Sequence, residues 1–155
     1  MSDRPPRLPP NALMIKLYNT PLASLLGRMF LLLTTRGRRS GLPRTTPLQY
    51  EVIQGAYNLG AARGVRADWV RNILANPSVA CRVGRRTFRA TARVVTESGP
   101  IADFLQVRLQ RHPHIVGAIL RSEGLPRKPA RADLEAYSAR LALVVLTPDP
   151  AGEPG

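Results

Sequence analysis

The stretch that decides the fold is "LLLTTRGRRSGLPRTTPLQY", residues 31–50. Residues 29–35 and 44–53 are rich in β-branched and other apolar side chains, and the link between them contains two glycines and a proline. This pattern predicts two antiparallel strands joined by a short turn. Four arginines lie in this link or directly after it: Arg36, Arg38, Arg39 and Arg44. Like charges repel and a turn needs only glycine and polar residues, so the arginines indicate an anion-binding site.

The composition indicates one basic domain. The chain has 155 residues, of which 44% are hydrophobic, and a formal net charge of +13. Only two of its 23 cationic residues are lysines, and the planar arginine fork suits phosphate and carboxylate groups. Such a surface attracts nucleic acid, anionic lipid or a multiply charged cofactor. The single cysteine, Cys81, excludes an internal disulfide, so the expected location is the cytoplasm.

The order of predicted elements indicates a mainly β (α+β) fold. Six strands, mostly joined by hairpins, predict a small β-barrel with flanking helices, because closure removes exposed strand edges. Within residues 29–148, the β domain, alternation is clearest in "TFRATARVV", where Phe88, Ala90 and Ala92 share one face. The proline- and glycine-rich ends, 1–10 and 149–155, are expected to be disordered tails.

The segment 11–28 is predicted to be helical and apolar on one side. It can pack on the barrel or make peripheral contact with a membrane, and the two alternatives stay open. The longest uninterrupted apolar run, 29–33, is too short to cross a bilayer. The first ten residues do not have the pattern of a signal peptide.

Common catalytic signatures are absent from the sequence. There is no G-x-S-x-G, no Walker A lysine motif and no G-x-G-x-x-G. Two histidines, His112 and His114, do not make a metal site, so no metal and no catalytic residue is predicted. The turn itself offers Arg38, Arg39 and Ser40 with freed backbone N–H groups, which can form an anion-binding concavity.

Two longer motifs carry a family resemblance. The stretch "LLLTTRGRRSGLPRTTPL", followed by "AARGVRADWVRNILANPSVACRVGRRTFRATARVV" at 61–95, resembles the deazaflavin-dependent nitroreductase family of the split β-barrel flavin-binding superfamily. The resemblance implies a split β-barrel that binds coenzyme F420, whose tail carries a phosphodiester and glutamates. It also implies hydride transfer from the reduced deazaflavin to a small electrophilic acceptor, such as a quinone, an enone or a nitro compound.

The resemblance also implies a set of site residues. Those implied for the cofactor are Arg38, Arg39, Ser40 and Arg44 at the acidic tail, Thr45, Thr46 and Pro47 at the ring system, Ala62, Arg63 and Gly64 in a following loop, and Trp69 on the next helix. Those implied for the acceptor pocket are Gln49, Tyr50, His112 and Tyr137. Residues 112–118 lack the tyrosines that shape the pocket of nitroimidazole-reducing members, which favours a quinone or enone. The proton would come from water or from the hydroxyl of Tyr50 or Tyr137.

Three alternatives remain from the sequence. The same arginines could hold the single phosphate of FMN. A basic module could bind nucleic acid, but the chain has only eight aromatic residues and none alternates with arginine on a strand, so no specific nucleic-acid partner is expected. A carrier of a hydrophobic ligand could use the apolar helices of 11–28. The oligomeric state is not predicted.

Overall fold

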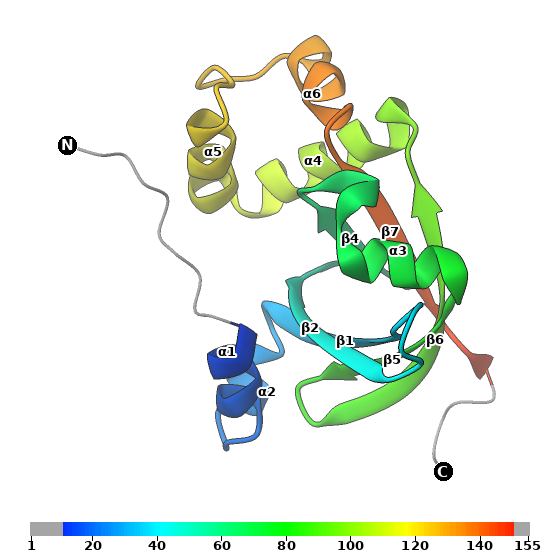
Figure 1. Cartoon of the computed structure of the whole chain (residues 1–155). Coiled ribbons are helices and arrows are strands. Elements are labelled where there is room, and N and C mark those ends of the chain that lie inside the picture. The colour runs from blue at the N-terminus through cyan, green and yellow to red at the C-terminus, as the bar shows by residue number, and fades with distance from the viewer. Residues whose placement is uncertain (1–10, 151–155) are drawn as a thin grey trace.

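The computed structural model describes residues 11–150, and the predicted tail 1–10 lies outside the described residues. Seven antiparallel strands form one sheet: β1 Phe30–Arg36, β2 Pro43–Gln49, β3 Glu51–Ile53, β4 Ala56–Ala61, β5 Ser78–Val83, β6 Arg86–Val95 and β7 Ala142–Pro148. The helices are α1 Asn11–Tyr18, α2 Ala23–Leu26, α3 Asp68–Ala75, α4 Ser98–Arg111, α5 Pro113–Ser122 and α6 Arg131–Ser138, with a 3₁₀ turn, η1, at Gly64–Arg66. The predicted mainly β fold with flanking helices is confirmed (Figure 1).

The sheet is curled into a barrel by the link between β2 and β3. The strand order is β2-β1-β5-β6-β7-β4-β3, so two strands that are consecutive in the chain lie at opposite edges. Only Tyr50 separates them, and the two edges must therefore approach one another. The prediction of one continuous strand over 44–53 is wrong for this reason, and the sheet has seven strands instead of six.

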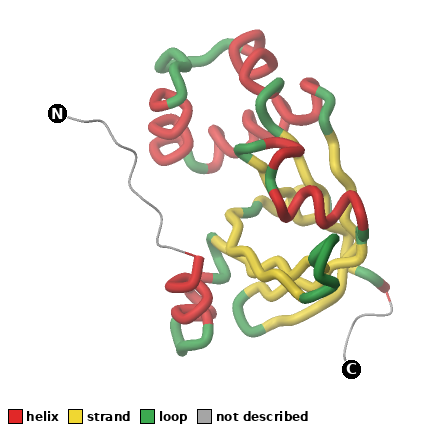
Figure 2. The backbone as a smooth tube through the Cα atoms, viewed as in Figure 1, coloured by secondary structure: helices red, strands yellow, loops and turns green. Residues whose placement is uncertain are grey.

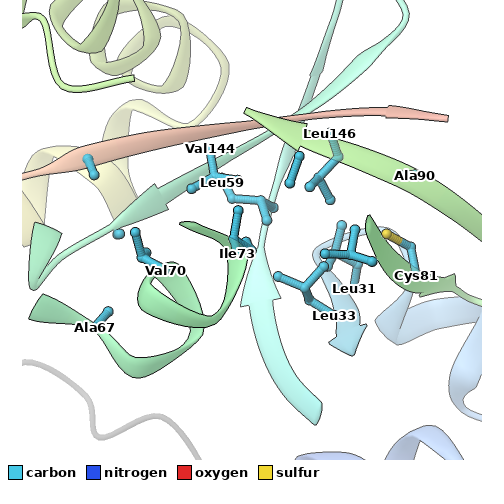
Figure 3. Close-up of a cluster of buried hydrophobic side chains, with 14 of the residues drawn as sticks. Leu31, Leu33, Leu59, Ala67, Val70, Ile73, Cys81, Ala90, Val144 and Leu146 are labelled. Carbon is cyan, nitrogen blue, oxygen red and sulfur yellow. The ribbon is translucent and has the colours of Figure 1, made fainter. Parts of the chain in front are cut away.

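The barrel interior is filled by small and branched apolar side chains (Figure 3). Leu31 and Leu33 of β1 lie opposite Val144 and Leu146 of β7, and Ile73 of α3 closes the cluster. All five are at most 2% exposed, and burying each such side chain stabilises the fold by about 1.5–3 kcal/mol.

The predicted faces of β6 are confirmed. Phe88, Ala90 and Ala92 are buried, whereas Arg89 and Arg93 are exposed. The period-2 pattern predicts these faces because one face of the strand packs in the barrel and the other faces solvent.

Two helical layers lie outside the barrel (Figures 1 and 2). Helices α4, α5 and α6 gather at one end, where Leu143 of β7 packs with Ile101 and Leu134. Helices α1 and α2 lie on another side and cover Leu32, the outward residue between Leu31 and Leu33. Helix α6 is 8 residues long, about two turns.

Helix α1 is fastened to the barrel by Tyr18. Its hydroxyl donates to the Phe30 carbonyl (3.0 Å) and accepts from the Gly84 N–H (2.7 Å). The guanidinium of Arg82 lies 5.2 Å from the ring centroid and donates to the Tyr18 carbonyl (3.0 Å). The predicted helical segment 11–28 therefore packs on the barrel through this face.

The C-terminal end of the described chain is held to β6 by hydrogen bonds. Asp149, the first residue of the predicted C-terminal tail, donates its N–H to the Arg89 carbonyl (2.9 Å) and accepts from the Thr91 hydroxyl (2.9 Å). Within residues 11–150, no helix has the length and apolar character needed to span a bilayer.

Candidate functional site

An open groove of about 590 Å³ lies where the β1–β2 turn meets α1 and α3. Seven of the predicted cofactor-binding residues line it: Arg38, Arg39, Ser40, Arg44, Thr45, Thr46 and Trp69. Ile15 of α1 forms a further part of its wall. A groove of this volume is in the range of small-molecule sites.

The turn that carries the arginines is ordered by its own hydrogen bonds. Gly37 N–H donates to the Leu42 carbonyl and Gly41 N–H to the Gly37 carbonyl, both at 2.8 Å. Leu42 N–H donates to Ser40 Oγ (3.2 Å). Gly41 has φ +70°, a conformation that glycine adopts without strain. With the N–H of Arg38 also bonded, four N–H groups of residues 37–42 are already satisfied, so side chains supply most of the anion-binding capacity.

Arg38 is bound to α3. Its Nη2 forms an ion pair with Asp68 Oδ1 (3.1 Å), and its Nη1 donates to Asn72 Oδ1 (2.9 Å). The backbone N–H of Arg38 donates to the same Asn72 oxygen (3.2 Å), and Asn72 Nδ2 donates to Thr35 Oγ1 (3.1 Å). Because Asn72 and Thr35 are both buried, this contact fixes the turn against the barrel.

Arg39 and Arg44 differ from Arg38. Both line the groove and are exposed, and within residues 11–150 neither forms an ion pair with a carboxylate. The next residue along β2, Thr45, shares a hydrogen bond with Thr34 across the hairpin (2.9 Å). The groove thus has two available cations beside a row of hydroxyl groups.

Four predicted cofactor residues do not line the groove: Pro47, Ala62, Arg63 and Gly64. Gly64 has φ +59°, and a Cβ added there would lie 3.0 Å from the Arg140 carbonyl oxygen. The close approach that this glycine permits is therefore to the chain's own backbone before β7.

One predicted acceptor-side residue, His112, contacts the buried carboxylate of Glu51, and another, Gln49, is linked to it through Arg108. Glu51 Oε1 lies 3.0 Å from His112 Nε2 and 3.6 Å from Arg108 Nε, and Glu51 Oε2 lies 3.1 Å from Arg111 Nη1. Arg108 Nη2 donates to Gln49 Oε1 (2.6 Å). Burial lowers the pKa of Arg108 below its ordinary value, and the Glu51 carboxylate partly opposes this shift. The cluster joins α4 to the β2–β3 junction.

The two predicted tyrosines lie apart from the groove lining. The Tyr50 hydroxyl donates to the Gly27 carbonyl, and its ring lies 5.5 Å from that of Tyr57. Tyr137 packs in the apolar cluster of α4, α5 and α6. Burial raises the pKa of both phenols, so both keep their protons at neutral pH.

Sequence reasoning missed Asp68, Asn72 and Glu51. Asp68 and Asn72 are 30 and 34 residues from Arg38, and nothing in the local pattern links them. For Asn72, an available signal was its place among apolar residues on the buried side of the helix "DWVRNILA". Glu51 gave no signal, because a lone carboxylate in a strand normally faces solvent.

Known structures share the architecture. A solved F420-H2-dependent reductase has a TM-score of 0.51 and 23% identity, covering 76% of this chain and 94% of its own. A pyridoxamine 5′-phosphate oxidase-like protein from Listeria innocua, itself described as putative, has a TM-score of 0.53 and 10% identity, covering 88% and 94%. At these identities the likeness defines the fold, and it places the chain in the class of split β-barrels.

Sequence comparison assigns the chain to one family within this class of fold. The model of the family described as F420H(2)-dependent quinone reductase matches residues 16–116, well over half of the chain. An F420H(2)-dependent quinone reductase from Mycobacterium tuberculosis is 38% identical over 73 residues, which cover 45% of this chain and 49% of that protein. The match thus spans about half the length of this relative. The chain belongs to the F420H(2)-dependent quinone reductase family.

Proposed function

We propose that the protein is an oxidoreductase that uses reduced coenzyme F420 to reduce a small electrophilic acceptor of the quinone class. The observation that carries the proposal is the groove beside the arginine turn, in which Arg39 and Arg44 have no carboxylate partner in the described chain. Membership of the family supports the same cofactor.

The groove residues fit the two halves of such a cofactor. Arg39 and Arg44 present guanidinium forks suited to phosphate and carboxylate groups. Thr45 and Thr46 give a polar floor of small side chains, and Trp69 and Ile15 give apolar walls. We therefore assign the arginine end to the anionic tail and the threonine–tryptophan part to the ring system.

When bound, reduced F420 supplies a hydride from its central ring. The chain's own contribution is to hold the anionic tail, orient the ring and exclude water from the reacting face. Gln49 and Tyr50 follow Thr46 along the same chain segment, and we propose this end of β2 as the acceptor side. The Tyr50 hydroxyl keeps its proton and donates a hydrogen bond to the Gly27 carbonyl. We therefore assign to water the proton that accompanies the hydride.

The test is a binding titration that reads the groove directly. Trp69 is the sole tryptophan of the chain and lines the groove, so its fluorescence reports occupancy. F420 should quench it in the wild type, and Arg39→Ala or Arg44→Ala should weaken binding at least about tenfold, because a hydrogen bond to a charged group contributes about 1.5–3 kcal/mol. Arg93→Ala removes the same charge from an exposed strand position outside the groove and should bind normally.

Other outcomes of this titration separate the alternatives. Quenching by FMN but not by F420 would keep the groove and change the cofactor. Equal losses in Arg39→Ala and Arg93→Ala would mean that only the general positive charge matters. Turnover is then measured with reduced F420 and a soluble quinone, following the return of the oxidised F420 absorbance.

We also propose that the exposed side of the segment 11–29, which contains α1 and α2, contacts anionic membranes. Leu13, Leu22, Leu25 and Met29 are large apolar residues with 46–62% of their surface exposed, and Arg28 beside them is exposed. Apolar insertion together with cationic attraction favours an anionic bilayer surface. Co-sedimentation with phosphatidylglycerol vesicles should fall in Leu22→Ser/Leu25→Ser, and binding that is unchanged in this variant would refute the proposal.

A further inference from the structure

Asp68 is an unexpected residue for an anion-binding groove. Among the groove-lining residues that the structure describes it is the only carboxylate, and its side chain is 81% exposed. A negative charge at this position repels an anionic ligand. Solubility alone therefore does not explain why a carboxylate lies in this groove.

The ion pair with Arg38 explains why a carboxylate lies at this position. The Arg38 side chain is 24% exposed; its Nη2 forms the ion pair with Asp68, whereas its Nη1 donates to buried Asn72. Asn72 holds both the backbone N–H and the Nη1 of Arg38, so the position of Arg38 does not depend on Asp68 alone. The Asp68 carboxylate occupies a donor of Arg38, Nη2, that would otherwise be open to a ligand.

We propose that Asp68 sets the affinity of the groove by competing with the bound anion for Arg38. The inference rests on the proposed function, because it requires an anionic cofactor in this groove. On arrival, a phosphate or carboxylate of the ligand displaces the Asp68 carboxylate from Nη2, while Asn72 keeps Arg38 in place. Asp68 thus weakens binding and eases release, and Asn72 is the positioning residue of the pair.

The proposal predicts a gain of affinity on removing a charge. Asp68→Asn keeps the size of the side chain and an oxygen that can accept from Arg38, but abolishes the competing charge. An exposed ion pair contributes about 0.2–1 kcal/mol, so the variant should bind F420 up to about fivefold more tightly. Screening shortens the reach of exposed charges to about 8 Å at physiological ionic strength, and the gain should therefore shrink as salt is added.

A structural role for Asp68 predicts a different result. Asp68 is the first residue of α3, where a carboxylate interacts favourably with the helix dipole. If this were its whole function, Asp68→Asn would lower the stability of the protein slightly and leave affinity unchanged or reduced.

The experiment is a double-mutant cycle with F420, read by Trp69 fluorescence at low and high NaCl. The proteins are the wild type, Asp68→Asn, Arg38→Ala and the double variant, with Asp103→Asn as control. Asp103 is also an exposed carboxylate paired with an arginine, Arg131 (2.7 Å), but lies on α4 outside the groove. Asp68→Asn should bind more tightly, Asp103→Asn should match the wild type, and the gain should disappear in the Arg38→Ala background.

Each other result has a definite meaning. If F420 quenches the wild type but Asp68→Asn shows equal or weaker affinity, the inference is overturned and the proposed function stands. If the gain persists without Arg38, Asp68 acts by repulsion at a distance, and the competition is refuted. If F420 does not bind the wild type at all, the proposed function fails and this inference fails with it.

Discussion

Replacing Glu51 with glutamine removes one negative charge from the interior and is expected to destabilise the protein strongly. The Glu51 side chain is 6% exposed and is surrounded by Arg108, Arg111 and His112. Glutamine has nearly the same shape and still offers an oxygen to these partners. The substitution therefore tests the charge of the cluster and leaves its packing in place.

The magnitude follows from the exposure of the partners. Arg108 is 19% exposed, and in this variant its guanidinium stays buried without a counter-charge; its Nε already has no hydrogen-bond partner. Breaking a buried pair in this way costs about 3–5 kcal/mol. Arg111 is 46% exposed, so its share is below about 1 kcal/mol. Because glutamine keeps an acceptor, we expect the low end, about 3 kcal/mol.

Urea unfolding at neutral pH measures the free energy of unfolding, and thermal unfolding gives an independent check. A loss of about 3 kcal/mol corresponds to a melting temperature about 6–12 °C lower in a domain of this size. Arg111→Gln is the matched control and should lose less than about 1 kcal/mol. Equal losses in the two variants, or a loss below about 1 kcal/mol in Glu51→Gln, would refute the reasoning that burial of Arg108 dominates.

Three further outcomes are expected. A Cβ at Gly27 would lie 2.6 Å from Gly84 Cα, so Gly27→Ala should lower the free energy of unfolding by about 1–3 kcal/mol; an unchanged melting temperature would contradict this. Tyr18→Phe leaves the Gly84 N–H without its acceptor and should cost about 1–3 kcal/mol in urea unfolding. Burial raises the pKa of Cys81 from 9.0 to about 12, so the unfolded thiol ionises first and stability falls from pH 9 to 12; that loss should be smaller in Cys81→Ala.

Much of the barrel could be predicted because its strands obey local rules. In β6 the alternation of Phe88, Ala90 and Ala92 with polar and charged residues indicates which face is buried. The break at Tyr50 could not be predicted in this way, because residues 48–53 contain neither glycine nor proline. The break exists because β2 pairs with β1 while β3 pairs with β4 at the opposite edge, which is a property of the whole curled sheet.

The candidate site likewise has one part that the sequence predicts and another that it does not. The turn residues Arg38, Arg39 and Arg44 are close in sequence, so their grouping at one groove could be predicted from the hairpin. The partners of Arg38 come from α3, and the contact depends on how that helix lies against the turn. The close packing of Gly64 could not be predicted for a similar reason, since its neighbour Arg140 follows it by more than seventy residues. Its place beside the cofactor stays a prediction.

Of the three arginines that line the groove, Arg38 also has a structural role. Arg38 reaches buried Asn72 and so joins the turn to the barrel, whereas Arg39 and Arg44 have no such contact in the described chain. Holding Arg38 against Asp68 also lowers the repulsion that gathered guanidinium groups would otherwise exert. A ligand that displaces Asp68 from Arg38 brings its own negative charge to the same place. Arg38 therefore faces a negative charge in both states, whereas Arg39 and Arg44 gain one only when the proposed anionic ligand binds.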